Sequence, residues 1–143
     1  MLDPSLHIGK TLRSVEPYLV SRDKILEFTR ALGDDNPLYQ GPDPTAPPTF
    51  AAVLTVRAWQ QLIDDPELGL ALKRIIHADQ EFTWHRLFRV GDVISTVTVL
   101  EDLRIRGGMD YMTVVVHVLD QDEAEVVQSR SLLIHKHAEE AAA

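Results

Sequence analysis

The sequence predicts an α+β fold in which an antiparallel sheet wraps around a long apolar helix. The stretch 49–63 contains no Gly or Pro and is apolar around most of its circumference, which is typical of a helix buried on more than one side. Several later segments are rich in branched residues or alternate apolar with polar residues, and glycines separate them. Helices followed by a run of strands indicate the α+β class.

The chain is long enough for one domain and too short for two. It has 143 residues, and a single core usually serves about 100 to 200. We therefore expect a single domain over 1–137, followed by a flexible tail over 138–143. The sequence contains no Cys, which excludes disulfides, thiolate metal sites and a cysteine nucleophile.

Charge and hydropathy narrow the classes of partner. The formal net charge of −8 opposes binding to phosphate backbones or anionic lipid. No apolar run approaches the roughly 20 residues that a membrane helix needs. The first ten residues lack the basic and apolar regions of a secretory signal. We expect a cytoplasmic protein that binds neither nucleic acid nor membrane.

The first third of the chain predicts a strand, a helix and a loop. Residues 12–20 fit a short edge strand because they include Pro17. Ser21 is a candidate N-cap for an amphipathic helix that ends at Gly33. Residues 34–48 are crowded with Gly, Pro, Asn and Asp, so we expect a loop with at most one helical turn. The apolar helix follows.

Four strands are expected after the apolar helix, and we expect them to form an antiparallel meander. In 76–85 the apolar face carries Ile76, Ala78, Phe82 and Trp84, interrupted by Gln80, while His77 and His85 fall on the polar face. Further strands are expected within 93–100, 112–118 and 126–134, with turns at 91–92 and 106–108. A sheet of this kind curved around one helix is the hot-dog fold, whose open edge is usually covered by dimerisation.

A motif lies in the loop between the two helices. Residues 33–39 read GDDNPLY and resemble the GDxNPLH motif of MaoC-like (R)-specific enoyl hydratases and 3-hydroxyacyl dehydratases, with five of the six specified positions matching. The resemblance continues through APPTF at 46–50 and HADQEFTWHRLFRVGD at 77–92. It is closest to the FAS1-like amino-terminal dehydratase type, the substrate-binding subunit of dehydratase heterodimers.

The resemblance implies reversible hydration of a 2-enoyl thioester to a (3R)-hydroxyacyl thioester. It places an acid at Asp34 and the second catalytic group at Tyr39, and the substrate is an acyl-CoA or an acyl carrier protein thioester. We expect six further residues to bind substrate: Asn36, Pro48, Thr49, Phe50, Trp59 and Arg86. No cofactor is expected, and the spacing of the histidines matches no zinc pattern.

Two departures from the family pattern weaken the catalytic assignment. Tyr39 replaces the His, and an unperturbed phenol, with a pKa of about 10 against about 6.5 for imidazole, is a far poorer base at neutral pH. Pro47 and Pro48 replace the His-Gly at the helix start, and proline has no N–H to donate to the thioester oxygen. Thr49 retains its amide one residue later.

Several interpretations therefore stay open. The chain is either a hot-dog subunit whose catalytic His comes from a partner chain, a self-sufficient homodimeric hydratase using Asp34 and Tyr39, or an acyl-CoA-binding protein without activity. A hot-dog thioesterase is a weaker rival. In the simplest alternative, residues 33–39 form only a helix stop and a turn, and Tyr39 is a packed loop aromatic.

Overall fold

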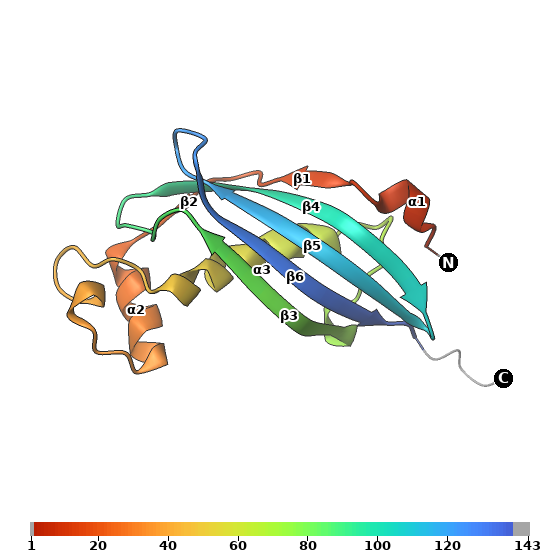
Figure 1. Cartoon of the computed structure of the whole chain (residues 1–143), viewed down its shortest axis with the longest axis horizontal. Coiled ribbons are helices and arrows are strands. Elements are labelled where there is room, and N and C mark those ends of the chain that lie inside the picture. Colours follow the sequence, from red (N-terminus) through yellow and green to blue (C-terminus); the bar gives the residue numbers. More distant parts are fainter. Residues whose placement is uncertain (1, 139–143) are drawn as a thin grey trace.

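A computed structural model of the chain describes residues 2–138. The tail expected over 138–143 lies, apart from Ala138, outside the described residues. Figure 1 shows the helix near the amino terminus and the end of the last strand at one end of a curved sheet, and a small helical lobe at the other end. No helix within the described residues is long and apolar enough to cross a membrane.

The amino-terminal strand is divided in two. A short helix, α1 (Pro4–His7), precedes β1 (Thr11–Arg13), and β2 (Tyr18–Leu19) follows. β1 pairs with residues 97–99 and β2 with residues 93–94, so both lie along the same neighbouring strand. Residues 15–17 leave that strand between them, at a point where Pro17 has no N–H to donate to a ladder. The single strand expected over 12–20 is therefore interrupted.

The first long helix, α2 (Arg22–Leu32), has the expected ends. The Ser21 side chain accepts a hydrogen bond from the Lys24 N–H at the amino-terminal end. Gly33 closes the other end in a left-handed conformation with φ of 67°, which a residue without Cβ adopts at little cost. The position of α2 is confirmed at both caps.

The sheet is antiparallel, with the order β1-β4-β5-β6-β3. Its long strands are β3 (Ile75–Trp84), β4 (Val93–Arg106), β5 (Met109–Leu119) and β6 (Glu125–Lys136). β4, β5 and β6 form a meander, and the tight turn at Gly107 and Gly108 joins the first two. β3 pairs with β6 rather than with β4, so the four-strand meander expected from the sequence is wrong, and β3 forms one edge of the sheet.

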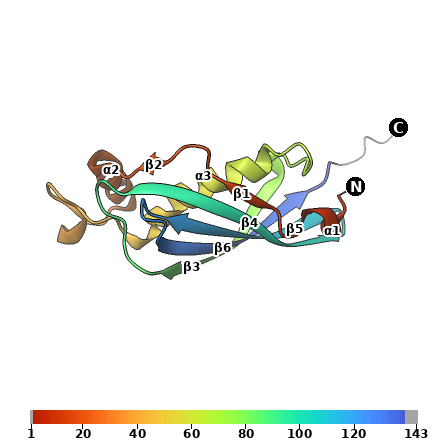
Figure 2. The ribbon, with the colours of Figure 1, turned by 90° about the horizontal axis from the view of Figure 1, so that it is seen from above.

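The apolar helix, α3 (Ala51–Ile63), lies along one face of the sheet, as Figures 1 and 2 show in two views. It follows two single helical turns, η1 (Pro37–Tyr39) and η2 (Pro48–Phe50); a third, η3 (Leu72–Arg74), precedes β3. Leu54, Ala58 and Leu62 are buried against the inner face of the sheet. The helix is not enclosed on all sides, because Val56, Arg57 and Gln60 are exposed. The α+β fold with a helix packed on a curved antiparallel sheet is confirmed.

A bulge in β3 changes which side chains face inward. The pairing with β6 shifts between His77 and Asp79. Ile76 is 55% exposed, whereas the His77 ring packs edge-on against Trp59 at 4.8 Å. The predicted faces of Ile76 and His77 are therefore wrong: one extra residue in a bulge reverses the alternation on one side of it.

Candidate functional site

The motif loop is held by hydrogen bonds between its own side chains and backbone. The Asp34 Oδ1 accepts from the Asn36 N–H at 3.0 Å, and the Asn36 Oδ1 accepts from the Leu38 N–H at 3.0 Å. Two consecutive turns of this kind fix residues 34–39 locally. Asn36 thereby caps η1, and its side chain stabilises the loop rather than pointing toward a ligand.

Asp34 lies at an open hollow of about 380 Å³ between α2 and the loop that follows it. Arg22 and Arg30 of α2 and Gln40 of the loop also line this hollow. Asp34 is exposed, and its second carboxylate oxygen accepts no hydrogen bond from the described residues. One oxygen of Asp34 thus stabilises the turn, while the other is free to contact a substrate or a water molecule.

Tyr39 is half-buried and does not line the hollow that contains Asp34. Its backbone N–H donates to the Asn36 carbonyl, and its hydroxyl makes no hydrogen bond within the described residues. The two catalytic residues expected from the motif are therefore close in sequence but do not share a cavity in this chain. This placement fits a packed loop aromatic.

The start of the α3 helix presents one free backbone donor. Pro47 and Pro48 have no N–H, and η2 begins with them. Thr49 is exposed and carries the first amide after the prolines, which makes no hydrogen bond within the described residues. Unpaired amides at a helix start are suited to a developing negative charge. The Thr49 N–H is thus a candidate donor to a thioester oxygen.

Phe50 and Trp59 are core residues. Phe50 is fully buried between Phe28 and Phe88, with ring centroids 5.5 and 5.8 Å away. Trp59 is 7% exposed and contacts His77. Neither lines the hollow at Asp34. In this structure the apolar face of α3 that was expected to contact an acyl chain is closed by packing.

Arg86 is engaged within the protein. Its guanidinium donates to both oxygens of Asp92, at 2.7 and 3.1 Å, and to Asp120 at 3.1 Å. The hydrogen bonds to Asp92 and Asp120 raise the pKa of Arg86 above its ordinary value, despite its partial burial. Arg86 joins the 85–92 connection to the turn between β5 and β6, and two carboxylates already neutralise its charge.

The histidines form two clusters that the sequence did not reveal. His85 and His117 hydrogen-bond to the two oxygens of Glu125, at 3.0 and 2.6 Å. His135 and His137 hydrogen-bond to the two oxygens of Asp110, at 3.0 and 2.6 Å, and Asp110 is 1% exposed. The pairing of distant strands brings these residues together, so the sequence alone does not show it.

The two remaining histidines are also away from the motif loop. His7 is buried in α1, and His77 contacts Trp59. None of the six histidines of the chain lines the hollow at Asp34. No group of three or more His, Asp or Glu side chains within residues 2–138 is arranged to hold a metal ion.

Comparison with known proteins gives the family. Residues 6–129 match the family described as the FAS1-like dehydratase domain region. A UPF0336 protein of Cutibacterium acnes is 41% identical over 132 residues, covering 92% of this chain and 93% of the relative.

Solved structures share the fold at lower identity. One chain of the HadBC (3R-hydroxyacyl-ACP dehydratase) complex of Mycobacterium tuberculosis superposes with a TM-score of 0.79 at 20% identity, covering 89% of this chain and 96% of that chain. An (R)-hydratase of A. caviae gives a TM-score of 0.69 at 20% identity, covering 94% and 98%. Since the family model spans most of the residues and the bacterial relative aligns along nearly its whole length, the chain belongs to the FAS1-like dehydratase domain family.

Proposed function

We propose that this chain is the acyl-thioester-binding subunit of a hot-dog dehydratase, and that a partner chain supplies the catalytic imidazole. The reaction is the reversible conversion of a (3R)-hydroxyacyl thioester into a 2-enoyl thioester and water. Family membership and the dehydratase and hydratase names of the structural neighbours support this reaction class. The substrate is an acyl-CoA or an acyl carrier protein thioester.

The observation that carries the proposal is the absence of an imidazole at Asp34. All six histidines lie within the described residues, and none lines the hollow that Asp34 shares with α2. Tyr39, which takes the place of the motif His, lies outside that hollow. General acid–base catalysis contributes roughly 10²–10⁴ to a rate, so a chain without its base is a feeble hydratase on its own.

The chemistry divides between the two chains. The carboxylate of Asp34 and an imidazole of the partner hold the water that adds to C3 of the enoyl group, and one of them accepts its proton. In the same addition C2 gains a proton, and negative charge develops on the thioester oxygen. The Thr49 N–H is positioned at an open helix start, where it can donate to that oxygen.

The free edge of β3 is a suitable place for a partner chain to bind. β3 pairs with β6 along one side only, so its other side presents unpaired backbone groups, and Ile76 lies exposed on it. The lobe of α2 and η1 extends past the end of the sheet in Figure 1, which leaves the hollow at Asp34 uncovered. A second hot-dog chain added along β3 would form hydrogen bonds with these unpaired backbone groups.

The test isolates the tagged chain from its own cells and identifies what co-purifies by mass spectrometry. We expect a hot-dog chain with an intact GDxNPLH motif. The purified chain alone should hydrate crotonyl-CoA negligibly, and the pair should hydrate it readily. Rapid turnover by the chain alone would contradict the proposal and favour a self-sufficient homodimer. Binding of acyl-CoA without turnover in every pairing would favour the non-catalytic alternative.

A further inference from the structure

A second hollow lies on the side of α3 that the sheet leaves open. It has a volume of about 520 Å³, within the usual size range of small-molecule sites. The hollow exists because residues 15–17 leave β4 between β1 and β2, so that a gap opens between this segment and α3. Asp34 and Tyr39 do not line it, so it is separate from the proposed thioester site.

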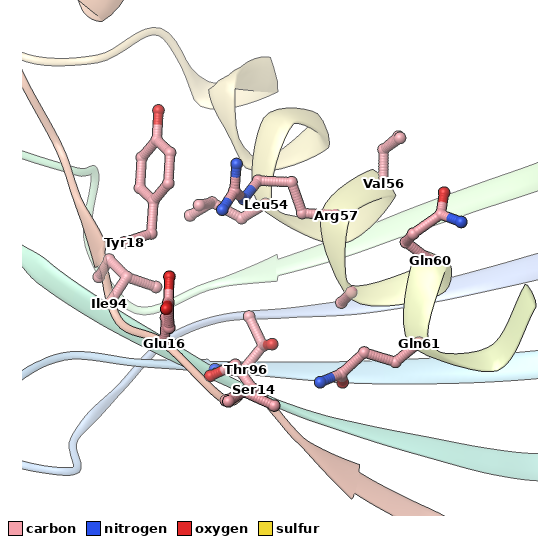
Figure 3. Close-up of a pocket in the computed structure, with 12 residues that line it drawn as sticks. Ser14, Glu16, Tyr18, Leu54, Val56, Arg57, Gln60, Gln61, Ile94 and Thr96 are labelled. Carbon is pink, nitrogen blue, oxygen red and sulfur yellow. The ribbon is translucent and has the colours of Figure 1, made fainter. Parts of the chain in front are cut away.

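The floor of this hollow is apolar and its rim is polar. Leu54 and Ala58 of α3 and Ile94 of β4 lie beneath the hollow and are almost fully buried, whereas Glu16 and Arg57 at its rim are exposed. Figure 3 shows Glu16 and Tyr18 entering the space from the amino-terminal segment, and Arg57 reaching toward Tyr18 from α3. A few polar groups converging over an apolar surface are the usual anatomy of a ligand site.

Two opposite charges face this hollow, and neither has a charged partner. The Arg57 guanidinium lies 5.0 Å from the centre of the Tyr18 ring and forms no ion pair within residues 2–138. Glu16 likewise makes no ion pair or hydrogen bond with the described residues. The other arginine singled out above, Arg86, is by contrast bound to two carboxylates. The hollow thus offers one free cation and one free anion.

A buried acceptor points to the same conclusion. The Gln61 Oε1 is buried and accepts no hydrogen bond. Its orientation is fixed, because the Gln61 Nε2 donates to the Arg13 carbonyl at 3.0 Å and a flipped amide would place two acceptors together. An unsatisfied buried acceptor is destabilising, so a shift of the amide that brought this oxygen to a ligand donor would be favourable.

We propose that this hollow binds a small zwitterion with an apolar body, that is, an apolar α-amino acid. Its carboxylate pairs with Arg57 and its ammonium with Glu16, while the apolar side chain lies on Leu54, Ala58 and Ile94. The Gln61 Oε1 is closed off in this structure, so it accepts from the ammonium only after the amide shifts toward the hollow. A fatty acyl chain fits less well, because it would leave Glu16 and the Gln61 oxygen without partners. Binding joins the amino-terminal segment to α3.

The test measures binding of four probes to the full chain by titration calorimetry: L-leucine, L-phenylalanine, leucinamide and N-acetyl-leucine. We expect saturable binding of the two amino acids. Leucinamide lacks the carboxylate and N-acetyl-leucine lacks the ammonium, so each should bind at least about tenfold more weakly than leucine, which is the effect of losing about 1.4 kcal/mol.

Variants locate the site. Arg57→Gln should reduce the affinity for leucine to that for leucinamide and leave the affinity for leucinamide unchanged. Glu16→Gln should reduce the affinity for leucine to that for N-acetyl-leucine and leave the affinity for N-acetyl-leucine unchanged. Arg106→Gln, at the exposed far hairpin, and Asp43→Asn, in an exposed loop, are matched controls that leave binding unchanged. Amide chemical shifts should change at 14–18 and 57–61.

Three results would overturn the inference. One is the absence of saturable binding by every probe. Another is a loss of affinity for leucine in Arg57→Gln and Glu16→Gln that is no greater than the loss in the control variants. The third is a set of shift changes confined to 33–41, which would assign the binding to the motif loop. Hydration activity is not part of the readout, so failure here leaves the proposed function intact.

Discussion

The Arg86 guanidinium makes a two-point contact with the Asp92 carboxylate, with N–O distances of 2.7 and 3.1 Å. Asp92 is 8% exposed and also accepts a hydrogen bond from the Arg89 N–H. The same guanidinium reaches Asp120, so one side chain joins the connection before β4 to the turn after β5. This arrangement stabilises the fold and leaves Arg86 itself unavailable to a substrate phosphate.

Removing this guanidinium should therefore cost stability. Arg86→Gln leaves the nearly buried Asp92 carboxylate without its charged donor, and hydrogen bonds to charged groups contribute about 1.5–3 kcal/mol. We expect the free energy of unfolding in urea to fall by about 2 kcal/mol. Arg89→Gln, an exposed neighbour, is the control and should change it by less than about 0.5 kcal/mol. An equal effect of the two variants would show that the pair contributes nothing.

Phe50 offers a test of whether the start of α3 is core or ligand surface. The side chain is fully buried between two other phenylalanine rings. Truncation of a buried Phe costs about 3–5 kcal/mol, so Phe50→Ala should strongly lower the denaturation midpoint. Leu38→Ala, at a site that is 66% exposed, should have little effect. A stable Phe50→Ala protein with altered acyl-chain preference would assign Phe50 to a substrate channel instead.

The sequence predicted what depends on local chemistry. The caps at Ser21 and Gly33 follow from chemistry within the helix ends, and both are found. The apolar run from Ala51 to Ile63 likewise forms a helix. In each case the relevant interactions lie within a few residues of one another, so a single sequence contains them.

The sequence did not predict what depends on pairing between distant residues. β3 pairs with β6, which is the farthest along the chain of the three strands that follow it. The residues 75–84 do not indicate which of these strands is the partner. The bulge at His77 reversed the facing of Ile76 for the same reason. Arg86 was expected to bind substrate, and its contact with Asp120 could not be predicted because the two residues are distant in sequence. The sequence showed the motif at the candidate site, but it did not show that Asp34 and Tyr39 lie in different places.

Glu125 should make stability depend on pH. Burial raises the pKa of this carboxyl, but the hydrogen bonds with His117 and His85 outweigh that effect and hold the pKa below its ordinary value. A carboxyl with a lowered folded pKa stabilises the protein above its unfolded pKa, and this contribution disappears as the pH falls through the folded value. Glu125→Gln should therefore cost about 1–2 kcal/mol near neutral pH and little in acid.

The measurement compares urea unfolding of the Glu125→Gln and wild-type proteins near pH 7 and again at about pH 3, well below the ordinary Glu pKa of about 4.3. The difference between the two proteins should shrink at the lower pH. Glu81→Gln, at an exposed position of β3, is the control and should show no such trend. A difference that stays constant with pH would mean that Glu125 acts through packing rather than through its charge.

The unpaired side of β3 should govern assembly. Ile76 is 55% exposed on this edge strand, and a carboxylate at such a position opposes pairing with another strand. We expect light scattering to report an assembly larger than the 16.1 kDa chain for wild type and a single chain for Ile76→Asp. Val15→Asp, at a site 92% exposed and on the amino-terminal segment, should assemble like wild type. An Ile76→Asp protein that keeps its folded spectrum and its assembly would place the partner elsewhere on the sheet.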